Sequence, residues 1–183
     1  MAQLFKILLL FFLIFAVNIG NNSNCFAAIH GALEYKIPIE YSKMNEEELN
    51  STAEFYYNNS LKNNSKEVDE NTSKALILYT MLSNKNPQNI IYTVRLGSLY
   101  DKIGKDRWAK GSFYKAMGVA PSRPEPYFYL GEFYFKRQLY RKALKMYKKA
   151  YKNGYSSHSM TIIRLKEIYI MLGDKEGLKA IGH

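Results

Sequence analysis

Cysteine and histidine are scarce in this sequence, with one cysteine and three histidines among 183 residues. A single cysteine, Cys25, cannot form an intramolecular disulfide, which excludes a disulfide-stapled fold. The histidines His30, His158 and His183 lie far apart, and none has a second histidine or the cysteine one helical turn away. Metal sites need several such side chains to converge. We therefore expect no metal site, and no thiol chemistry if Cys25 is removed with a cleaved signal peptide.

Motifs of enzymes and nucleotide-binding proteins are also missing. A phosphate-binding loop has four residues between its glycines and Ser or Thr after the Lys. Here six residues separate Gly97 from Gly104, and Asp106 follows Lys105. No Gly-x-Ser-x-Gly elbow occurs either. We expect a protein that is not an enzyme and that uses no cofactor.

Long apolar runs are absent, since the longest, residues 7–17, has eleven residues behind Lys6. A helix needs about 20 apolar residues to span a bilayer, whereas a short run behind a basic residue is typical of a secretory signal. Small residues near Ala27 suit a cleavage site after that position. We predict that residues 1–27 are a signal peptide of an exported, periplasmic or secreted protein, or hold it at the inner membrane if uncleaved. Residues 28–44 are expected to form an extended N-terminal arm.

Sustained alternation of apolar and polar residues is missing as well, so we predict an all-α fold. Short breaks such as IGKD and LGD separate predicted helices of roughly 12 to 15 residues. A shift of 34 residues superimposes the sequence on itself at Gly97 and Gly131, Tyr100 and Tyr134, Ala109 and Ala143, and Ala116 and Ala150. A period of this length indicates stacked helix pairs, each covering an apolar face of the next.

The repeated positions resemble those of the tetratricopeptide repeat family. The match is closest in residues 90–123, where the signature positions hold Leu96, Gly97, Tyr100, Gly104, Ala109, Phe113, Ala116 and Pro121. The next repeat departs from the pattern at Gln138, in place of the inter-helix glycine, and at Tyr155, in place of the proline. The resemblance implies an α-solenoid of antiparallel helix pairs over residues 45–183, with about three repeats and a partial fourth.

Members of this family usually bind a protein or peptide in a concave groove lined by the first helix of each repeat. The corresponding residues here are Ile91, Val94, Ser98, Phe128, Glu132, Phe135, Met160 and Ile163. We expect the strongest anchors to be Val94, Phe128, Phe135 and Ile163, in a groove that is apolar and mildly acidic. The resemblance thus implies a non-catalytic scaffold or adaptor for a partner protein. Alternatively, the arm at residues 28–44 folds back and fills the groove.

Acidic residues are missing from residues 136–152, which carry eight Lys and Arg side chains in a chain of formal charge +10. Removal of residues 1–27, with one basic and no acidic residue, leaves 10 − 1 = +9. We expect an exposed convex face that presents Trp108, Arg141, Lys145, Lys148 and Lys149. Such a face is either simply solvated or docks on an anionic membrane or an acidic partner. Nucleic acid is not expected as a partner of an exported protein.

These features together predict an exported scaffold of a bacterial cell envelope. Two alternatives stay open. In the first, the protein is a self-associating subunit of an envelope assembly, whose incomplete fourth repeat stacks on another chain. In the second, it is a peripheral membrane adaptor that uses the basic convex face.

Overall fold

The computed structural model describes residues 38–62 and 65–181, so the expected signal peptide and residues 28–37 of the expected arm lie outside it. The chain divides into two compact units, Met1–Met44 and Asn45–His183. The described part of the first unit contains a one-turn helix, α3 (Ile39–Ser42), where an extended arm was expected. Pro38 precedes this helix, and its carbonyl accepts a hydrogen bond of 3.0 Å from the Tyr41 N–H. Proline favours a helix start because its φ is already helical.

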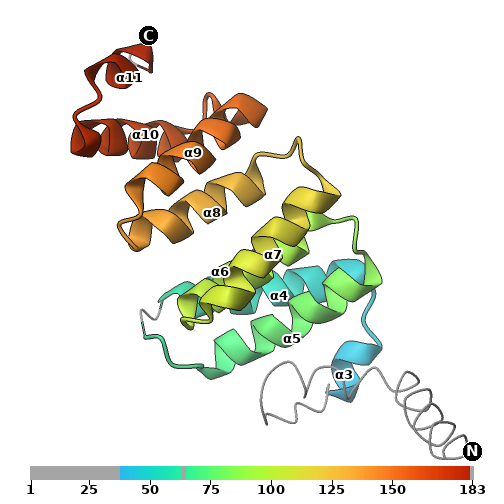
Figure 1. The fold of residues 1–183 in the computed structure, drawn as a ribbon. Coiled ribbons are helices and arrows are strands. Elements are labelled where there is room, and N and C mark those ends of the chain that lie inside the picture. Colours follow the sequence, from blue (N-terminus) through green and yellow to red (C-terminus); the bar gives the residue numbers. More distant parts are fainter. Residues whose placement is uncertain (1–37, 63–64, 182–183) are drawn as a thin grey trace, which may run out of the picture. The chain divides into compact units, whose positions relative to one another are not determined.

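The second unit, called the repeat domain below, is built of antiparallel helix pairs (Figure 1). Its helices are α4 (Glu46–Lys62), α5 (Glu70–Lys85), α6 (Ile90–Lys102), α7 (Asp106–Val119), α8 (Glu125–Lys136), α9 (Tyr140–Ala150), α10 (Ser159–Leu172) and α11 (Lys175–Ala180), with a π-helical turn, η1 (Tyr151–Tyr155), after α9. The pairs α4/α5, α6/α7, α8/α9 and α10/α11 are called repeats 1 to 4. Successive helices pack together, and α6 also contacts α8. The described residues contain no strand, so the all-α prediction is confirmed.

Polar residues at the helix starts explain where several of these helices begin. Asn45 and Glu48 form a reciprocal pair before α4: the Asn45 side chain accepts from the Glu48 N–H at 3.0 Å, and the Glu48 carboxylate accepts from the Asn45 N–H at 2.9 Å. Asp69 accepts from the Thr72 N–H at 2.7 Å at the start of α5. Such side chains satisfy N–H groups that have no partner within the helix. None of the helices in the described residues has the length and apolar character needed to cross a membrane.

Glycine and aromatic residues set the distance between the two helices of a repeat. A Cβ atom on Gly97 of α6 would lie 2.6 Å from the Phe113 ring of α7. A Cβ on Gly131 of α8 would lie 2.7 Å from the Tyr147 ring of α9. Both rings are buried. The 34-residue period therefore corresponds to a repeated contact in which a ring packs directly on glycine backbone.

The turn between the two helices of a repeat needs a left-handed backbone. Gly104 and Gly173 adopt φ values of 72° and 67° in repeats 2 and 4. Gln138, at the corresponding position of repeat 3, adopts φ 58°. A residue with a Cβ is strained in this region. Repeat 3 therefore keeps the left-handed turn at the cost of strain at Gln138.

Candidate ligand-binding groove

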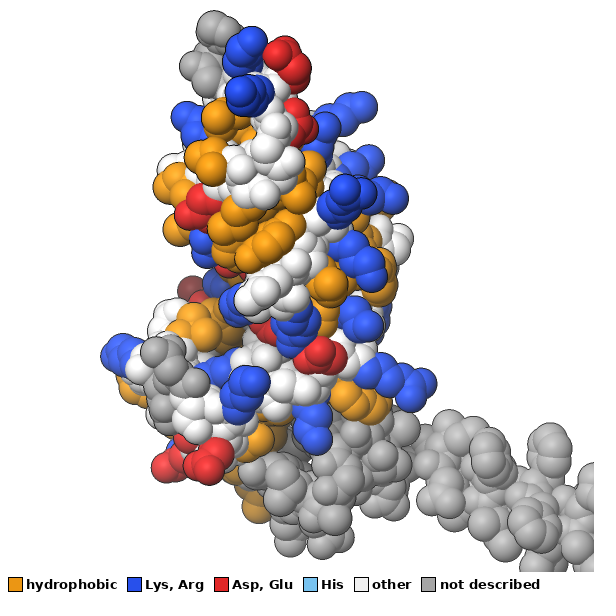
Figure 2. Space-filling view, turned by 60° about the vertical axis from the view of Figure 1, so that its left-hand side comes forward, with side chains coloured by type: hydrophobic (Ala, Val, Ile, Leu, Met, Phe, Trp, Pro, Cys, Tyr) orange, Lys and Arg blue, Asp and Glu red, His pale blue; other side chains and the backbone are white. Residues whose placement is uncertain are grey.

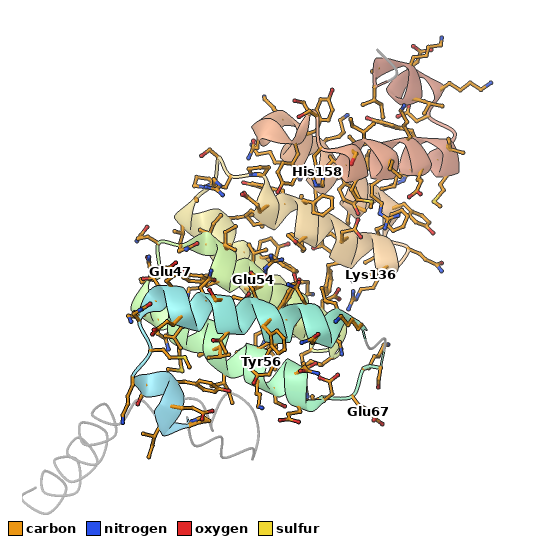
Figure 3. All side chains as sticks on the ribbon, turned by 180° about the vertical axis from the view of Figure 1, so that it is seen from behind. Glu47, Glu54, Tyr56, Glu67, Lys136 and His158 are labelled. Carbon is orange, nitrogen blue, oxygen red and sulfur yellow. The ribbon has the colours of Figure 1, made fainter. Side chains whose placement is uncertain are left out.

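The first helices of the repeats line a groove of about 930 Å³ in the repeat domain. Its lining includes Arg95 and Ser98 from α6, Tyr129 and Glu132 from α8, and Arg164 from α10. Figure 3 looks onto α4, α8 and α10 and labels Glu54 of α4 and Lys136 of α8. The groove is therefore polar and charged as well as aromatic, whereas the sequence predicted an apolar and mildly acidic surface.

A cluster of four side chains lies at one side of the groove and joins repeats 1 and 2. Tyr79 of α5 donates to the Glu54 carboxylate at 2.7 Å, and Arg95 donates to the same carboxylate at 3.0 and 3.3 Å. The Arg95 guanidinium also lies 4.4 Å from the centre of the Tyr57 ring. Burial raises the pKa of Tyr79 above its ordinary value, and the hydrogen bond to Glu54 raises it further. Arg95 is thus held by a carboxylate and an aromatic ring.

The same cluster recurs between repeats 3 and 4. Tyr147 of α9 donates to Glu132 at 2.6 Å, and Arg164 donates to Glu132 at 2.7 and 3.3 Å. The Arg164 guanidinium lies 4.4 Å from the centre of the Phe135 ring. The pKa of Tyr147 is raised by burial first and then by its bond to Glu132. The hydrogen bond to Glu132 also raises the pKa of Arg164. Both arginines stay charged.

The layer between these clusters has neither a carboxylate equivalent to that of Glu132 nor a hydroxyl equivalent to that of Tyr147. Repeat positions equivalent to Glu132, Tyr147 and Arg164 hold Ser98, Phe113 and Tyr129, which we call the central layer. Arg95 reaches into this layer and donates to the Tyr129 hydroxyl at 3.2 Å. The three residues of the central layer line the groove, with the buried Phe113 ring at its floor. The middle of the groove therefore lacks the carboxylate of the two flanking clusters, and Arg95 is the cation that reaches it.

A third set of charges closes the groove near the inter-helix turns. Asp101 of α6 accepts from Lys136 at 2.9 Å and from Arg137 at 2.8 Å. Arg137 also pairs with Asp106 and lies over the Phe133 ring at 3.6 Å. The hydrogen bond from Arg137 lowers the pKa of Asp106. These contacts fasten α8 to α6 and α7, so they stabilise the shape of the groove.

The two clustered arginines keep hydrogen-bonding capacity toward the groove. A guanidinium has five N–H donors. Arg95 donates three bonds, to Glu54 and Tyr129, and Arg164 donates three, to Glu132 and Glu167, among the described residues. Their side chains are 23% and 24% exposed. Each therefore has two N–H groups and an open side for a carbonyl or carboxylate oxygen.

The structure separates the predicted groove residues into two sets. Ser98, Phe128, Glu132 and Met160 line the groove, whereas Ile91, Val94, Phe135 and Ile163 do not.

The expected anchors need correction. Val94 is 2% exposed because it faces the helix-packing interface, one residue before Arg95. Phe135 holds Arg164, and Phe128 packs on Tyr155 and His158, with ring centres 5.8 and 4.9 Å away. These aromatic residues support the groove and do not serve as open anchors.

The predicted convex residues all lie at the surface. Arg141, Lys145, Lys148 and Lys149 are exposed on α9. Trp108 of α7 is 42% exposed, with its ring centre 6.1 Å from that of Tyr100.

Sequence reasoning missed Arg95, Tyr129 and Arg164. The repeat spacing could have identified them, because shifts of 34 and then 35 residues align these three positions with one another. The same shifts align Ser98, Glu132 and Glu167. In the segments that the structure covers, no group of three or more His, Cys, Asp or Glu side chains is arranged to hold a metal ion. The arrangement provides hydrogen-bond donors around a central layer that has no carboxylate.

Comparisons with known proteins place the fold. The chain is similar to two crystal structures of MamA, each at 20% identity, with TM-scores of 0.51 and 0.50. These matches cover 61% and 72% of this chain and 64% and 70% of the MamA chains, so the first spans less than two thirds of its relative. It is also similar to the TPR2B-domain:pHsp70-complex of yeast Sti1, at 15% identity and a TM-score of 0.53, over 75% of this chain and 95% of that one. No family model and no curated protein matches the chain. The fold is a tetratricopeptide-repeat-like α-solenoid, as the sequence predicted.

Proposed function

We propose that this protein is a non-catalytic scaffold whose groove binds an extended or helical segment of a partner protein. One observation carries the proposal. Two matching clusters fix Arg95 and Arg164 on either side of a central layer that lacks their carboxylate and hydroxyl. An uncharged side chain of the partner enters this layer beside Ser98.

The clusters explain how the groove grips a segment of variable sequence. The carboxylates of Glu54 and Glu132 already neutralise the two arginines. A further charge on the partner is therefore not required. The remaining N–H groups of Arg95 and Arg164 donate to backbone carbonyls, which every peptide has. Since both side chains are held before binding, little rotamer entropy is lost when the partner arrives.

A similar structure supports this use of the fold. The TPR2B domain of yeast Sti1, which resembles this chain in fold, was solved as a complex with pHsp70. At 15% identity this likeness does not transfer the partner. The partner chemistry proposed here rests on the central layer instead.

Selection from a displayed library of random peptides tests the proposal. Peptides that bind the wild-type protein are labelled, and their affinities are measured by fluorescence anisotropy with wild type, Ser98→Glu and Ser122→Glu. Ser98→Glu puts a carboxylate into the central layer, so we expect binding to fall at least tenfold. Ser122 is exposed in the α7–α8 loop and does not line the groove, so Ser122→Glu is the matched control. Equal binding by wild type and Ser98→Glu would remove the central layer from the site.

Export is part of the proposed function. The support is the sequence alone: the apolar run at residues 7–17 behind Lys6 and the small residues around Ala27. Mass spectrometry of the protein recovered from the cells that make it tests this point. A mature chain that starts at residue 28 supports cleavage and export, and a full-length chain in the cytosol contradicts both.

Self-association is a second candidate, favoured by apolar side chains on α10. Ile163, Ile170 and Met171 are 46%, 66% and 54% exposed on this helix of the last repeat. Stacking of repeats on a second copy would cover such a face. Sedimentation equilibrium decides the question, because a molar mass of one chain at all concentrations excludes self-stacking.

A further inference from the structure

The outer surface of α9 carries an unusual concentration of positive charge. Its exposed side presents Arg141, Lys142, Lys145, Lys148 and Lys149, and Lys152 follows in η1. No acidic residue occurs in α9 or η1. Ala143, Tyr147 and Ala150 are buried on the opposite side. Figure 2 shows Lys and Arg side chains gathered along one edge of the repeat domain. We call the six cations of α9 and η1 the α9 basic face.

The α9 basic face differs from the groove in how its charges are neutralised. Arg95, Arg137 and Arg164 in the groove all pair with carboxylates. None of the six cations on the α9 basic face forms an ion pair within residues 38–62 and 65–181. The Nζ atoms of Lys142 and Lys149 each lie 5.8 Å from the centre of a tyrosine ring, that of Tyr134 and that of Tyr127 respectively. The charge on this face is therefore available to a partner.

Several of these cations oppose the local stability of α9, although Lys148 and Lys149 lie in the last turn, where the helix dipole favours positive charge. Arg141 and Lys142 lie in its first turn, where the helix dipole favours negative charge. Lys145 lies four residues from both Arg141 and Lys149, and like charges at that spacing repel. Solubility alone does not require a purely positive helix, because mixed charges give it without this repulsion. An anionic surface would relieve the repulsion.

We infer that the α9 basic face docks the repeat domain on an anionic phospholipid surface. A row of cations along an eleven-residue helix extends about 16 Å and spreads over many lipid headgroups. Five of the six cations are Lys, which attracts anions as a point charge, whereas Arg favours the bidentate recognition of nucleic acids. Leu139, which directly precedes α9 and is 42% exposed, adds an apolar side chain of the type found on interfacial helices. The apolar run at residues 7–17 is a second membrane-directed feature.

The test uses the full chain and vesicles of phosphatidylcholine with and without one third phosphatidylglycerol. The vesicles contain a dansyl lipid, so energy transfer from Trp108, the single tryptophan, reports the approach of the repeat domain itself. Insertion of residues 7–17 would bring Trp108 near neutral and anionic vesicles alike, so the difference in transfer between the two vesicle types reports the α9 basic face. We expect transfer with anionic vesicles only, and its loss at high salt because screening shortens the range of the attraction.

Charge reversal locates the surface. Each Lys near an anionic membrane strengthens binding about fivefold, so Lys145→Glu/Lys148→Glu/Lys149→Glu is expected to weaken it about a hundredfold or more. The matched control, Lys85→Glu/Lys166→Glu/Lys175→Glu, makes the same change of charge at exposed positions outside α9. Circular dichroism checks that both variants keep the wild-type helix content.

Three outcomes would overturn the inference. Equal transfer with neutral vesicles would show that the charge is not used. Equal loss in both triple variants would show an effect of net charge and not of α9. Tighter binding of a duplex DNA or an acidic polypeptide than of anionic vesicles, lost in the α9 variant, would assign the face to that partner. Peptide binding in the groove is measured separately, so failure here leaves the proposed function standing.

Discussion

The Tyr147 hydroxyl donates a hydrogen bond of 2.6 Å to the Glu132 carboxylate, which joins the two helices of repeat 3. Tyr79 and Glu54 make the same bond at 2.7 Å in repeat 1. In repeat 2 the ring is Phe113 and the carboxylate is replaced by Ser98, so both partners are absent together. A buried hydroxyl without its acceptor costs free energy, which explains why the two residues change jointly.

Removal of the Tyr147 hydroxyl should therefore destabilise the repeat domain. Tyr147→Phe keeps the ring against Gly131 but leaves Glu132 with one donor fewer, and we expect a loss of about 1–3 kcal/mol in the free energy of unfolding. Urea denaturation followed by circular dichroism measures it. The control is Tyr140→Phe, at a half-buried ring whose hydroxyl forms no hydrogen bond within the described residues, with an expected change below about 0.5 kcal/mol. Equal effects would show that the Glu132 bond contributes nothing.

The central layer should accept the missing cluster when both partners are introduced. Phe113→Tyr alone buries a hydroxyl opposite Ser98, and Ser98→Glu alone adds a carboxylate opposite a phenyl ring. In the double variant the new groups bond to each other, so we expect a favourable interaction energy of about 1 kcal/mol in a double-mutant cycle. Additive effects on the urea midpoint would contradict the equivalence of the three repeats.

The fold could be predicted because its determinants repeat in the sequence. Gly97 and Phe113 recur as Gly131 and Tyr147 at one constant shift, and each pair makes a single contact that only a small residue permits. Such a pattern is readable from one chain. The left-handed turn at Gln138 was not readable, because the glycine that marks it in repeat 2 is absent.

The groove was less predictable because its contacts join helices far apart in the sequence. Arg95 and Glu54 are 41 residues apart, across a loop that is longer than in the other repeats. Each looks like an ordinary surface charge when taken alone. The sequence favours Val94 as an anchor because it is apolar, yet Val94 lies in the core and the neighbouring Arg95 lines the groove.

Close packing at Gly97 should make this residue irreplaceable. Gly97→Ala brings a Cβ within 2.6 Å of the Phe113 ring, so the ring or the helix must move, and we expect a loss of about 1–3 kcal/mol. Gly111→Ala is the control, because no atom lies within 4 Å of a Cβ at that helical position. It should raise the stability by about 1 kcal/mol through helix propensity. Urea denaturation of the two variants should give changes of opposite sign.

The strained turn at Gln138 should be relieved by glycine. A non-glycine residue at φ 58° destabilises the folded protein by about 1–2 kcal/mol, and glycine avoids this strain. Glycine also loses more conformational entropy on folding, which offsets part of the gain. We expect Gln138→Gly to stabilise the protein by about 0.5–1 kcal/mol. The reverse change in repeat 2, Gly104→Gln at φ 72°, should destabilise it. Thermal denaturation compares the two, and a Gln138→Gly variant with a lower midpoint than wild type would contradict the strain.

Alkaline pH should destabilise the protein through its buried tyrosines. Burial, and then the hydrogen bonds to Glu54 and Glu132, raise the pKa of Tyr79 and Tyr147 above the ordinary 10.0. Above pH 10 the unfolded chain therefore loses these protons while the folded chain keeps them. Stability present below pH 10 is lost as the pH rises, by about 1.4 kcal/mol per pH unit for each tyrosine.

The double variant Tyr79→Phe/Tyr147→Phe isolates this contribution. It is less stable than wild type at pH 8 because two hydrogen bonds are gone, but its unfolding free energy should fall less steeply between pH 10 and 11.5. Tyr100, whose pKa burial raises to about 12, remains in both proteins and contributes equally to both slopes. Urea denaturation at several pH values gives the two slopes. Parallel slopes would mean that Tyr79 and Tyr147 ionise as readily in the folded protein as in the unfolded chain, and that the two clusters do not hold their protons.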